Sequence, residues 1–135
     1  MLGAKLEAMN ALFAVCFGAS AGALARWQLG LWFNTSGATL PWGTLAANLS
    51  GGYLVGIAVG VFQALPNLDP TWRLLCVTGF LGGLTTFSSF SAEVVQMLMQ
   101  QRYAIALGTA TLHLLGSLVL TVIGIRTVEF ILSRS

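Results

Sequence analysis

Long apolar stretches alternate with short polar segments along this chain, and the charged residues are confined to the polar segments. Asp, Glu, Lys and Arg are absent from four long intervals, which lie between Glu7 and Arg26, Arg26 and Asp69, Arg73 and Glu93, and Arg102 and Arg126. A membrane helix needs about 20 predominantly apolar residues. The interval 27–68 is too long for one span, and it contains the helix-breaking run 34–37 and then Pro41. The pattern therefore predicts four membrane helices, at residues 8–33, 42–64, 71–101 and 103–132.

The composition is typical of a membrane protein. Hydrophobic residues make up 56% of the 135 residues and charged residues only 7%, whereas a soluble domain carries about 25% charged residues. We therefore interpret residues 1–135 as one all-α domain embedded in the lipid bilayer. The net charge of +2 does not indicate a nucleic-acid-binding surface, and Cys16 and Cys76 lack the spacing of a metal motif.

The third predicted helix has a clear start and an unusual centre. Asp69 can cap it, and Pro70 suits the first helical position. Residues 79–91 then contain three glycines, followed by five hydroxyl side chains within seven residues. Irregular backbone at membrane depth is tolerated only where it is buried in protein or lines a watery path. We therefore predict a helix broken in mid-membrane, whose freed carbonyls near Gly82 and Thr85 suit a hard monovalent cation.

Other polar and aromatic side chains within the predicted spans are candidates for an ion path. The amide of Asn48 either makes an interhelical hydrogen bond or donates its NH₂ group to an anion. Phe87 and Phe90 share one helical face, where they either pack in a core or turn their positive ring edges toward a dehydrated anion. Moderate binding of this kind lets an ion leave again.

A polar stripe runs along the fourth predicted helix, where Thr109, His113 and Ser117 follow one another at intervals of four residues. The stripe indicates either a hydrated track or separate interhelical bonds, and the histidine is either a proton relay or a neutral hydrogen-bonding group. Arg26 and Glu93 are costly charges near the ends of spans. Arg26 either extends to the interface or draws anions to a vestibule, and Glu93 either pairs with a cation or accepts from hydroxyls.

Small residues and charge predict a dimer. Glycines recur at four-residue intervals on the first two helices, as Gly18 and Gly22 and as Gly52, Gly56 and Gly60, a spacing that lets helix backbones approach closely in lipid. A monomer would leave the hydroxyl-rich segment facing lipid. The basic residues differ little between the two predicted sides, with Lys5, Arg73, Arg126 and Arg134 on one and Arg26 and Arg102 on the other. Such a weak bias favours subunits inserted in opposite orientations.

Three segments, 22–27, 41–52 and 79–93, resemble the Fluc (CrcB) fluoride channels of bacteria. The resemblance covers nearly the whole chain. It implies passive export of cytoplasmic fluoride, and so fluoride resistance, by an antiparallel dual-topology homodimer with two pores in the inner membrane. It also implies a structural sodium ion at the dimer centre, held by the backbone carbonyls of Gly82 and Thr85 of both subunits.

The resemblance also assigns the fluoride pathway. The family's paired phenylalanines correspond to Phe87 and Phe90, its pore asparagine to Asn48, and its polar track to Thr109, His113 and Ser117. We also place the hydroxyls of Thr86 and Ser88 and the guanidinium of Arg26 along this pathway.

Two other functions are possible for a small four-span protein, and the sequence fits each of them less well than a channel. A small multidrug-resistance antiporter is also a four-span dual-topology dimer, but it needs a carboxylate deep in the first span, and none lies between Glu7 and Arg26. A non-transporting assembly subunit would explain the glycines but not the cluster of Thr, Ser and Phe. An enzyme is not expected, since no nucleophile–base pair or metal set is visible.

Overall fold

The computed structural model describes residues 2–34 and 39–134, so most of the predicted breaker run 34–37 lies outside the described residues. Within them every regular element is a helix, and no strand occurs. Four helical stretches are long and apolar enough to cross a membrane. The prediction of an all-α fold with four membrane-spanning helices is therefore confirmed.

Three of the four spans are single helices, namely α1 (Leu2–Phe33), α2 (Trp42–Ala64) and α6 (Tyr103–Leu132). The remaining span consists of α3 (Pro70–Arg73), the π-helix η1 (Leu74–Leu81), α4 (Gly82–Leu84) and α5 (Phe87–Met99). The first helix begins before the predicted residue 8, because Leu, Ala, Lys and Glu in its first turns favour a helix beyond the length a bilayer requires. The third span ends before the predicted residue 101, because Gln101 has a φ of 60° that turns the chain out of the helix.

The predicted start of the third span is confirmed. Pro70 occupies the first turn of α3, and the Asp69 carboxylate accepts a hydrogen bond from the backbone N–H of Thr71 at 2.8 Å. This bond favours the ionised carboxylate and so holds the pKa of Asp69 below its usual range. The cap satisfies one of the N–H groups that a helix start leaves without an intrahelical partner.

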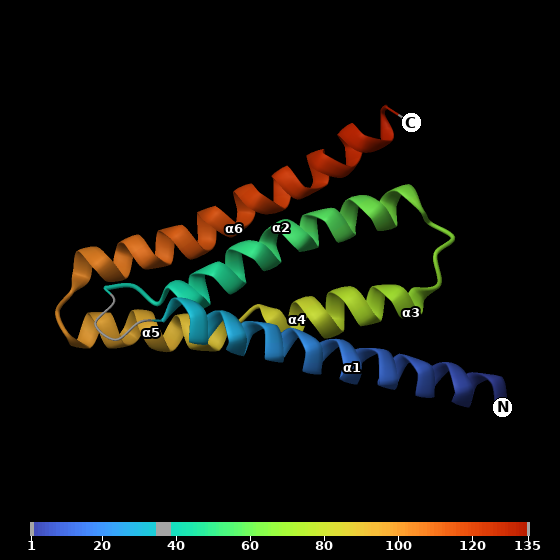
Figure 1. Cartoon of the computed structure of the whole chain (residues 1–135), viewed down its shortest axis with the longest axis horizontal. Coiled ribbons are helices and arrows are strands. Elements are labelled where there is room, and N and C mark those ends of the chain that lie inside the picture. Colours follow the sequence, from blue (N-terminus) through green and yellow to red (C-terminus); the bar gives the residue numbers. More distant parts are fainter. Residues whose placement is uncertain (1, 35–38, 135) are drawn as a thin grey trace.

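The two ends of the molecule carry different parts of the chain. Figure 1 shows both termini and the α2–α3 connection at one end, with the start of α2 and the α5–α6 connection at the opposite end. This is the arrangement that an even number of antiparallel spans produces.

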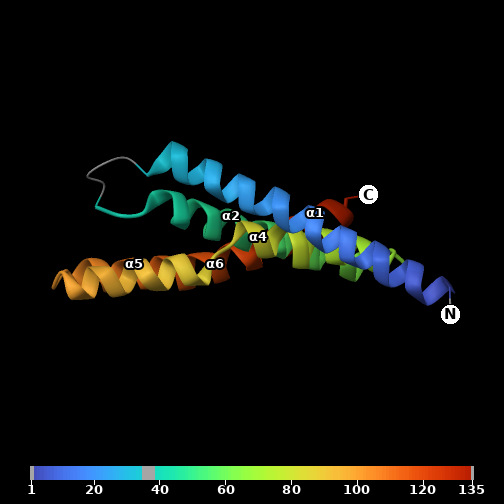
Figure 2. The same ribbon diagram turned by 90° about the horizontal axis from the view of Figure 1, so that it is seen from below.

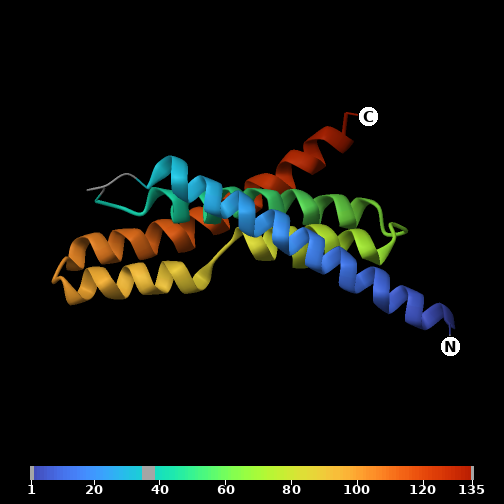
Figure 3. The same cartoon turned by 60° about the horizontal axis from the view of Figure 1, so that its bottom comes forward.

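The third span changes its packing partner along its length. Its first half, from α3 to α4, lies against α1, whereas α5 lies against α6 (Figures 2 and 3). Between the halves, Thr85 and Thr86 have extended backbone, with ψ of 154° and 115°. We call these two residues the Thr85–Thr86 segment. The most extensive helix contact is between α2 and α6.

Glycines permit the close helix contacts, as their spacing predicted. A Cβ atom at Gly22 would collide with the carbonyl of Phe80, and one at Gly56 would collide with the carbonyl of Thr121. The buried core is small and centres on Ala47, Leu81 and Leu84. Most large apolar side chains of α1 and α6 are exposed in the isolated chain, as expected of helices that face lipid.

Candidate functional site

The Asn48 amide holds the backbone of the Thr85–Thr86 segment from the neighbouring helix. Its Oδ1 accepts from the Thr86 N–H at 2.8 Å, and its Nδ2 donates to the Thr86 carbonyl at 3.1 Å. The same Nδ2 lies 3.0 Å from His113 Nδ1 on α6. Asn48 therefore makes interhelical bonds, and both hydrogens of its NH₂ group have protein acceptors in this structure. Its donation to an anion stays a prediction.

The hydroxyls of the polar run satisfy the helix ends around this segment. Thr86 caps α5, since its Oγ1 accepts from the Ser89 N–H at 3.2 Å. The Thr85 hydroxyl donates to the Leu81 carbonyl at 2.8 Å. On the α1 side, Arg26 Nε donates to the Gly83 carbonyl at 3.0 Å. Several of the backbone polar groups that the extended segment leaves without helical partners are therefore satisfied by side chains.

Two carbonyls at this segment lose the partners that a continuous helix would give them. In an α-helix the Gly82 carbonyl accepts from the N–H of Thr86, and the Thr85 carbonyl accepts from the N–H of Ser89. Here the Thr86 N–H is bound to Asn48 and the Ser89 N–H is bound to the Thr86 hydroxyl. These are the two carbonyls that the resemblance connects with a cation.

Aromatic rings cover the same site from α5. The Phe90 ring lies over the imidazole of His113, with ring centroids 4.7 Å apart and planes tilted by 30°. Phe87 meets Phe90 edge to face, with centroids 5.6 Å apart. His113 is only 5% exposed, whereas Phe87 is 79% exposed in the isolated chain. The ring pair therefore leads from the buried histidine to the surface.

These groups border one open groove of about 450 Å³ between α2, the third span and α6. Most of the predicted site residues line it, namely Asn48, Gly82, Thr85, Thr86, Phe87, Phe90, His113 and Ser117. Three others do not line it. Thr109 is buried with its hydroxyl 3.5 Å from the Met97 sulfur, Arg26 lies beside Gly83, and Ser88 is exposed with its Oγ 3.3 Å from the Thr86 hydroxyl.

One groove residue was missed in the sequence. Thr121 lines the groove, and its hydroxyl donates to the carbonyls of Gly52 and Ser117, both at 2.9 Å. It continues the four-residue spacing from Ser117, so extending the polar stripe by one more step would have found it.

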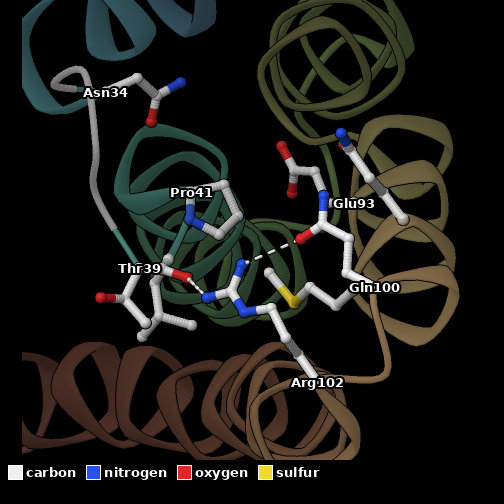
Figure 4. Close-up of a pocket in the computed structure, with 9 residues that line it drawn as sticks. Asn34, Thr39, Pro41, Glu93, Gln100 and Arg102 are labelled. Carbon is white, nitrogen blue, oxygen red and sulfur yellow. Dashed lines mark hydrogen bonds between the residues drawn. The ribbon is translucent and has the colours of Figure 1, made fainter.

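A second, smaller pocket of about 270 Å³ lies near the end of the bundle that carries the α5–α6 connection (Figure 4). The guanidinium of Arg102 lines this pocket and donates to the Thr39 carbonyl at 2.9 Å and to Gln100 Oε1 at 3.3 Å. Glu93 also borders this pocket, and its Oε1 accepts from the hydroxyl of Thr44. Of the two roles considered for Glu93, accepting from a hydroxyl is the one observed.

A protein-family model described as "CrcB-like protein, Camphor Resistance (CrcB)" matches residues 13–125. The chain belongs to the CrcB family. The relatives of this CrcB chain include proteins named "Fluoride-specific ion channel FluC". The one from Albidiferax ferrireducens is 69% identical over 128 residues, covering 95% of this chain and 98% of the relative. The one from Variovorax paradoxus is 66% identical over 118 residues, covering 87% of this chain and 94% of the relative.

A third FluC relative, from Paracidovorax citrulli, is 59% identical over 120 residues, covering 89% of this chain and 94% of the relative. The family resemblance found in the sequence is thereby confirmed. Together with the four helices capable of spanning a bilayer, family membership identifies this CrcB protein as a multi-pass membrane protein.

Proposed function

We propose that this chain is a fluoride-selective channel that exports cytoplasmic fluoride passively and so gives fluoride resistance. The observation that carries the proposal is the 69% identity, over 95% of the chain, to a protein named as a fluoride-specific ion channel. Family membership favours the channel over the small multidrug-resistance antiporter, which the first span already disfavoured because no carboxylate lies between Glu7 and Arg26.

The groove geometry supports a path for a small anion. Fluoride is strongly hydrated, so any path must replace its water with other donors. The groove is lined by Ser117 and Thr86, which carry hydroxyls, and by the rings of Phe87 and Phe90. It places no Lys or Arg among its lining residues. Neutral donors and ring edges hold an anion weakly enough for it to move on. Thr109, Ser88 and Arg26 lie outside this groove of the single chain, and their part in the path stays a prediction.

The working unit in this proposal is an antiparallel homodimer whose third helices are broken in mid-membrane. In an isolated chain the groove opens at the surface, where Gly82 and Phe87 are exposed, and its mainly apolar lining includes the polar side chains of Asn48, Thr86 and Ser117. Polar groups facing lipid are costly, and a second copy seated over the groove would cover them. The weak charge bias between the two ends favours opposite orientations. Tags at the termini should therefore be accessible from both sides of the inner membrane, and accessibility from one side only would rule out dual topology.

A structural sodium ion at the dimer centre completes the proposal. The carbonyls of Gly82 and Thr85 have lost their helical partners to Asn48 and to the Thr86 hydroxyl. Neutral carbonyl oxygens suit a hard monovalent cation. Gly82 is exposed in the isolated chain, which leaves room for the same residue of a second copy to approach it. Sodium bound there would satisfy the carbonyls of both subunits at once.

Fluoride efflux from liposomes tests the proposed function. Purified protein should release fluoride down its gradient, without ATP and with the proton gradient clamped, and should release chloride far more slowly. Empty liposomes serve as the control. Fluoride release that stops when the proton gradient is clamped would support the antiporter, and equal release of both anions would refute a fluoride-selective channel.

A further inference from the structure

We infer that Asn48 is a positioning residue that fixes the hydrogen of His113 on Nε2, and that this N–H is a hydrogen-bond donor reserved for the permeating anion. The first part rests only on hydrogen-bond geometry. The second part rests on the proposed function.

The argument starts at the backbone of Thr86, whose polarity is fixed. An N–H can only donate and a carbonyl can only accept. The side-chain atom of Asn48 that lies 2.8 Å from the Thr86 nitrogen must therefore be the oxygen, and the atom 3.1 Å from the Thr86 carbonyl must be the nitrogen. The backbone thus decides which way the Asn48 amide faces.

The amide orientation then decides the state of the imidazole. Asn48 Nδ2 carries only donors, and it lies 3.0 Å from His113 Nδ1. A hydrogen on Nδ1 would set two donors against each other, so Nδ1 must be the acceptor. An imidazole whose Nδ1 accepts is neutral and carries its hydrogen on Nε2. Both the other tautomer and the imidazolium would break this bond.

The resulting Nε2–H has nowhere to donate within the described part of the chain. The Nε2 atom is buried and has no hydrogen-bond partner there, and His113 as a whole is 5% exposed. A buried polar group without a partner destabilises the folded protein, so its retention needs a reason. His113 lines the groove, and the Phe90 ring covers one face of the imidazole. A small anion in the groove is an acceptor that would satisfy this donor.

The chain offers an unusually clean test, because His113 is its only histidine. Protein made with ¹⁵N-labelled histidine gives the two ring nitrogens of one residue, and their shifts and couplings to the ring protons show which nitrogen carries hydrogen. For the wild-type protein in lipid or detergent we expect Nε2 protonated and Nδ1 bare. A protonated Nδ1, or a mixture of tautomers, would overturn the inference without any variant.

An isosteric variant tests the role of Asn48. In Asn48→Asp a carboxylate oxygen replaces Nδ2 and can only accept. Nδ1 of His113 should therefore become protonated, either because the ring hydrogen moves there from Nε2 or because a second hydrogen is added to give the imidazolium. Asn67→Asp makes the same chemical change in the α2–α3 connection and should leave the imidazole signals unchanged. If Asn48→Asp does not fold, Asn48→Ala provides the second test, and we expect a mixture of tautomers. An unchanged bare Nδ1 in either folded variant would show that Asn48 does not set the tautomer.

Fluoride addition separates this inference from the proposed function. Fluoride should shift the Nε2 and Hε2 signals of the wild-type protein, whereas an equal concentration of chloride should not. If the tautomer is as expected and fluoride leaves these signals unchanged while liposomes still release fluoride, the donor role is refuted and the channel stands. If liposomes release no fluoride, the proposed function fails while the tautomer assignment survives.

Discussion

The Nε atom of Arg26 on α1 donates a hydrogen bond to the carbonyl of Gly83, at 3.0 Å and 57 residues away in the chain. In a continuous helix this carbonyl would accept from the N–H of Phe87, the first residue of α5. The guanidinium therefore serves as a cap for α4, a role that neither interpretation of Arg26 from the sequence had included.

Two substitutions of Arg26 separate this cap from its charge. Glutamine places an N–H at the position of Nε without the charge, whereas lysine keeps the charge and has a methylene there. If capping matters, the stability of Arg26→Gln should stay close to that of the wild-type protein. Arg26→Lys should lose about 1–3 kcal/mol of stability from a poorly satisfied carbonyl, measured by thermal unfolding in detergent. Reduced fluoride flux in Arg26→Gln, with normal flux and stability in Arg26→Lys, would instead support the attraction of anions by charge.

The paired rings of the groove give a second prediction. Phe87→Ile and Phe90→Ile keep apolar bulk but remove the ring edges, so each should cut fluoride flux by at least about tenfold, or about 1.4 kcal/mol on a barrier. Flux from liposomes measures this, and gel filtration checks assembly. Phe17→Ile on α1 is the matched control, because Phe17 is 75% exposed in the isolated chain and Phe87 is 79% exposed. Full flux in both groove variants would mean that the rings only pack.

The contact between α2 and α6 gives a third prediction. A Cβ atom at Gly56 would collide with the backbone carbonyl of Thr121, which cannot move aside as a flexible side chain can. Gly56→Ala should therefore cost at least about 1–3 kcal/mol, measured by unfolding in mixed detergent. Gly108→Ala makes the same change at a site on α6 with no atom within 4 Å, and it should not destabilise the protein. Equal stability of the two variants would contradict the packing described here.

Sodium gives a fourth prediction, which needs no mutation. If the carbonyls of Gly82 and Thr85 hold sodium in the dimer, sodium should stabilise the assembled protein over the same concentration of potassium. At 100 times its dissociation constant, a ligand of the folded state adds about 2.7 kcal/mol. Thermal unfolding of protein purified without sodium, in either salt, measures the difference. Identical unfolding curves would argue against a sodium site.

The sequence was sufficient for the spans but not for the contacts between them. Intervals without charge predicted four helices because charged groups are so costly in a bilayer. Thr85 and Thr86, which lie within the hydroxyl run, have extended backbone, and a third helix broken in mid-membrane stays a prediction. The hydrogen-bond partners of Asn48 could not be predicted from the sequence. Its bonds to Thr86 and His113 join residues 38 and 65 positions apart, and no local pattern encodes such a pairing.

The polar stripe on α6 was only partly predictable for a geometric reason. Four residues turn an α-helix by slightly more than one revolution, so each step of the stripe rotates by about 40°. Over the steps from Thr109 to Thr121 the stripe therefore turns by about 120°. Thr109 faces Met97 on α5, while Ser117 and Thr121 face the groove and α2.

The extensive contact between α2 and α6 has a consequence for how the protein is made. A ribosome delivers α1 first and α6 last, so α1 can receive the first half of the third span while α6 is still unmade. During that interval α2 stands in the bilayer with the glycines at 52, 56 and 60 uncovered, and Asn48 has no His113 to meet. We expect a cysteine placed at Tyr53, whose hydroxyl lies 3.4 Å from that of Thr127 on α6, to react with a membrane-permeant thiol reagent in nascent chains arrested before α6. The same cysteine should react less in full-length chains. The last segment of the chain, α6, thus completes the bundle. Translation arrest or truncation within α6 should therefore prevent assembly more completely than deletion of the same number of residues from the start of α1.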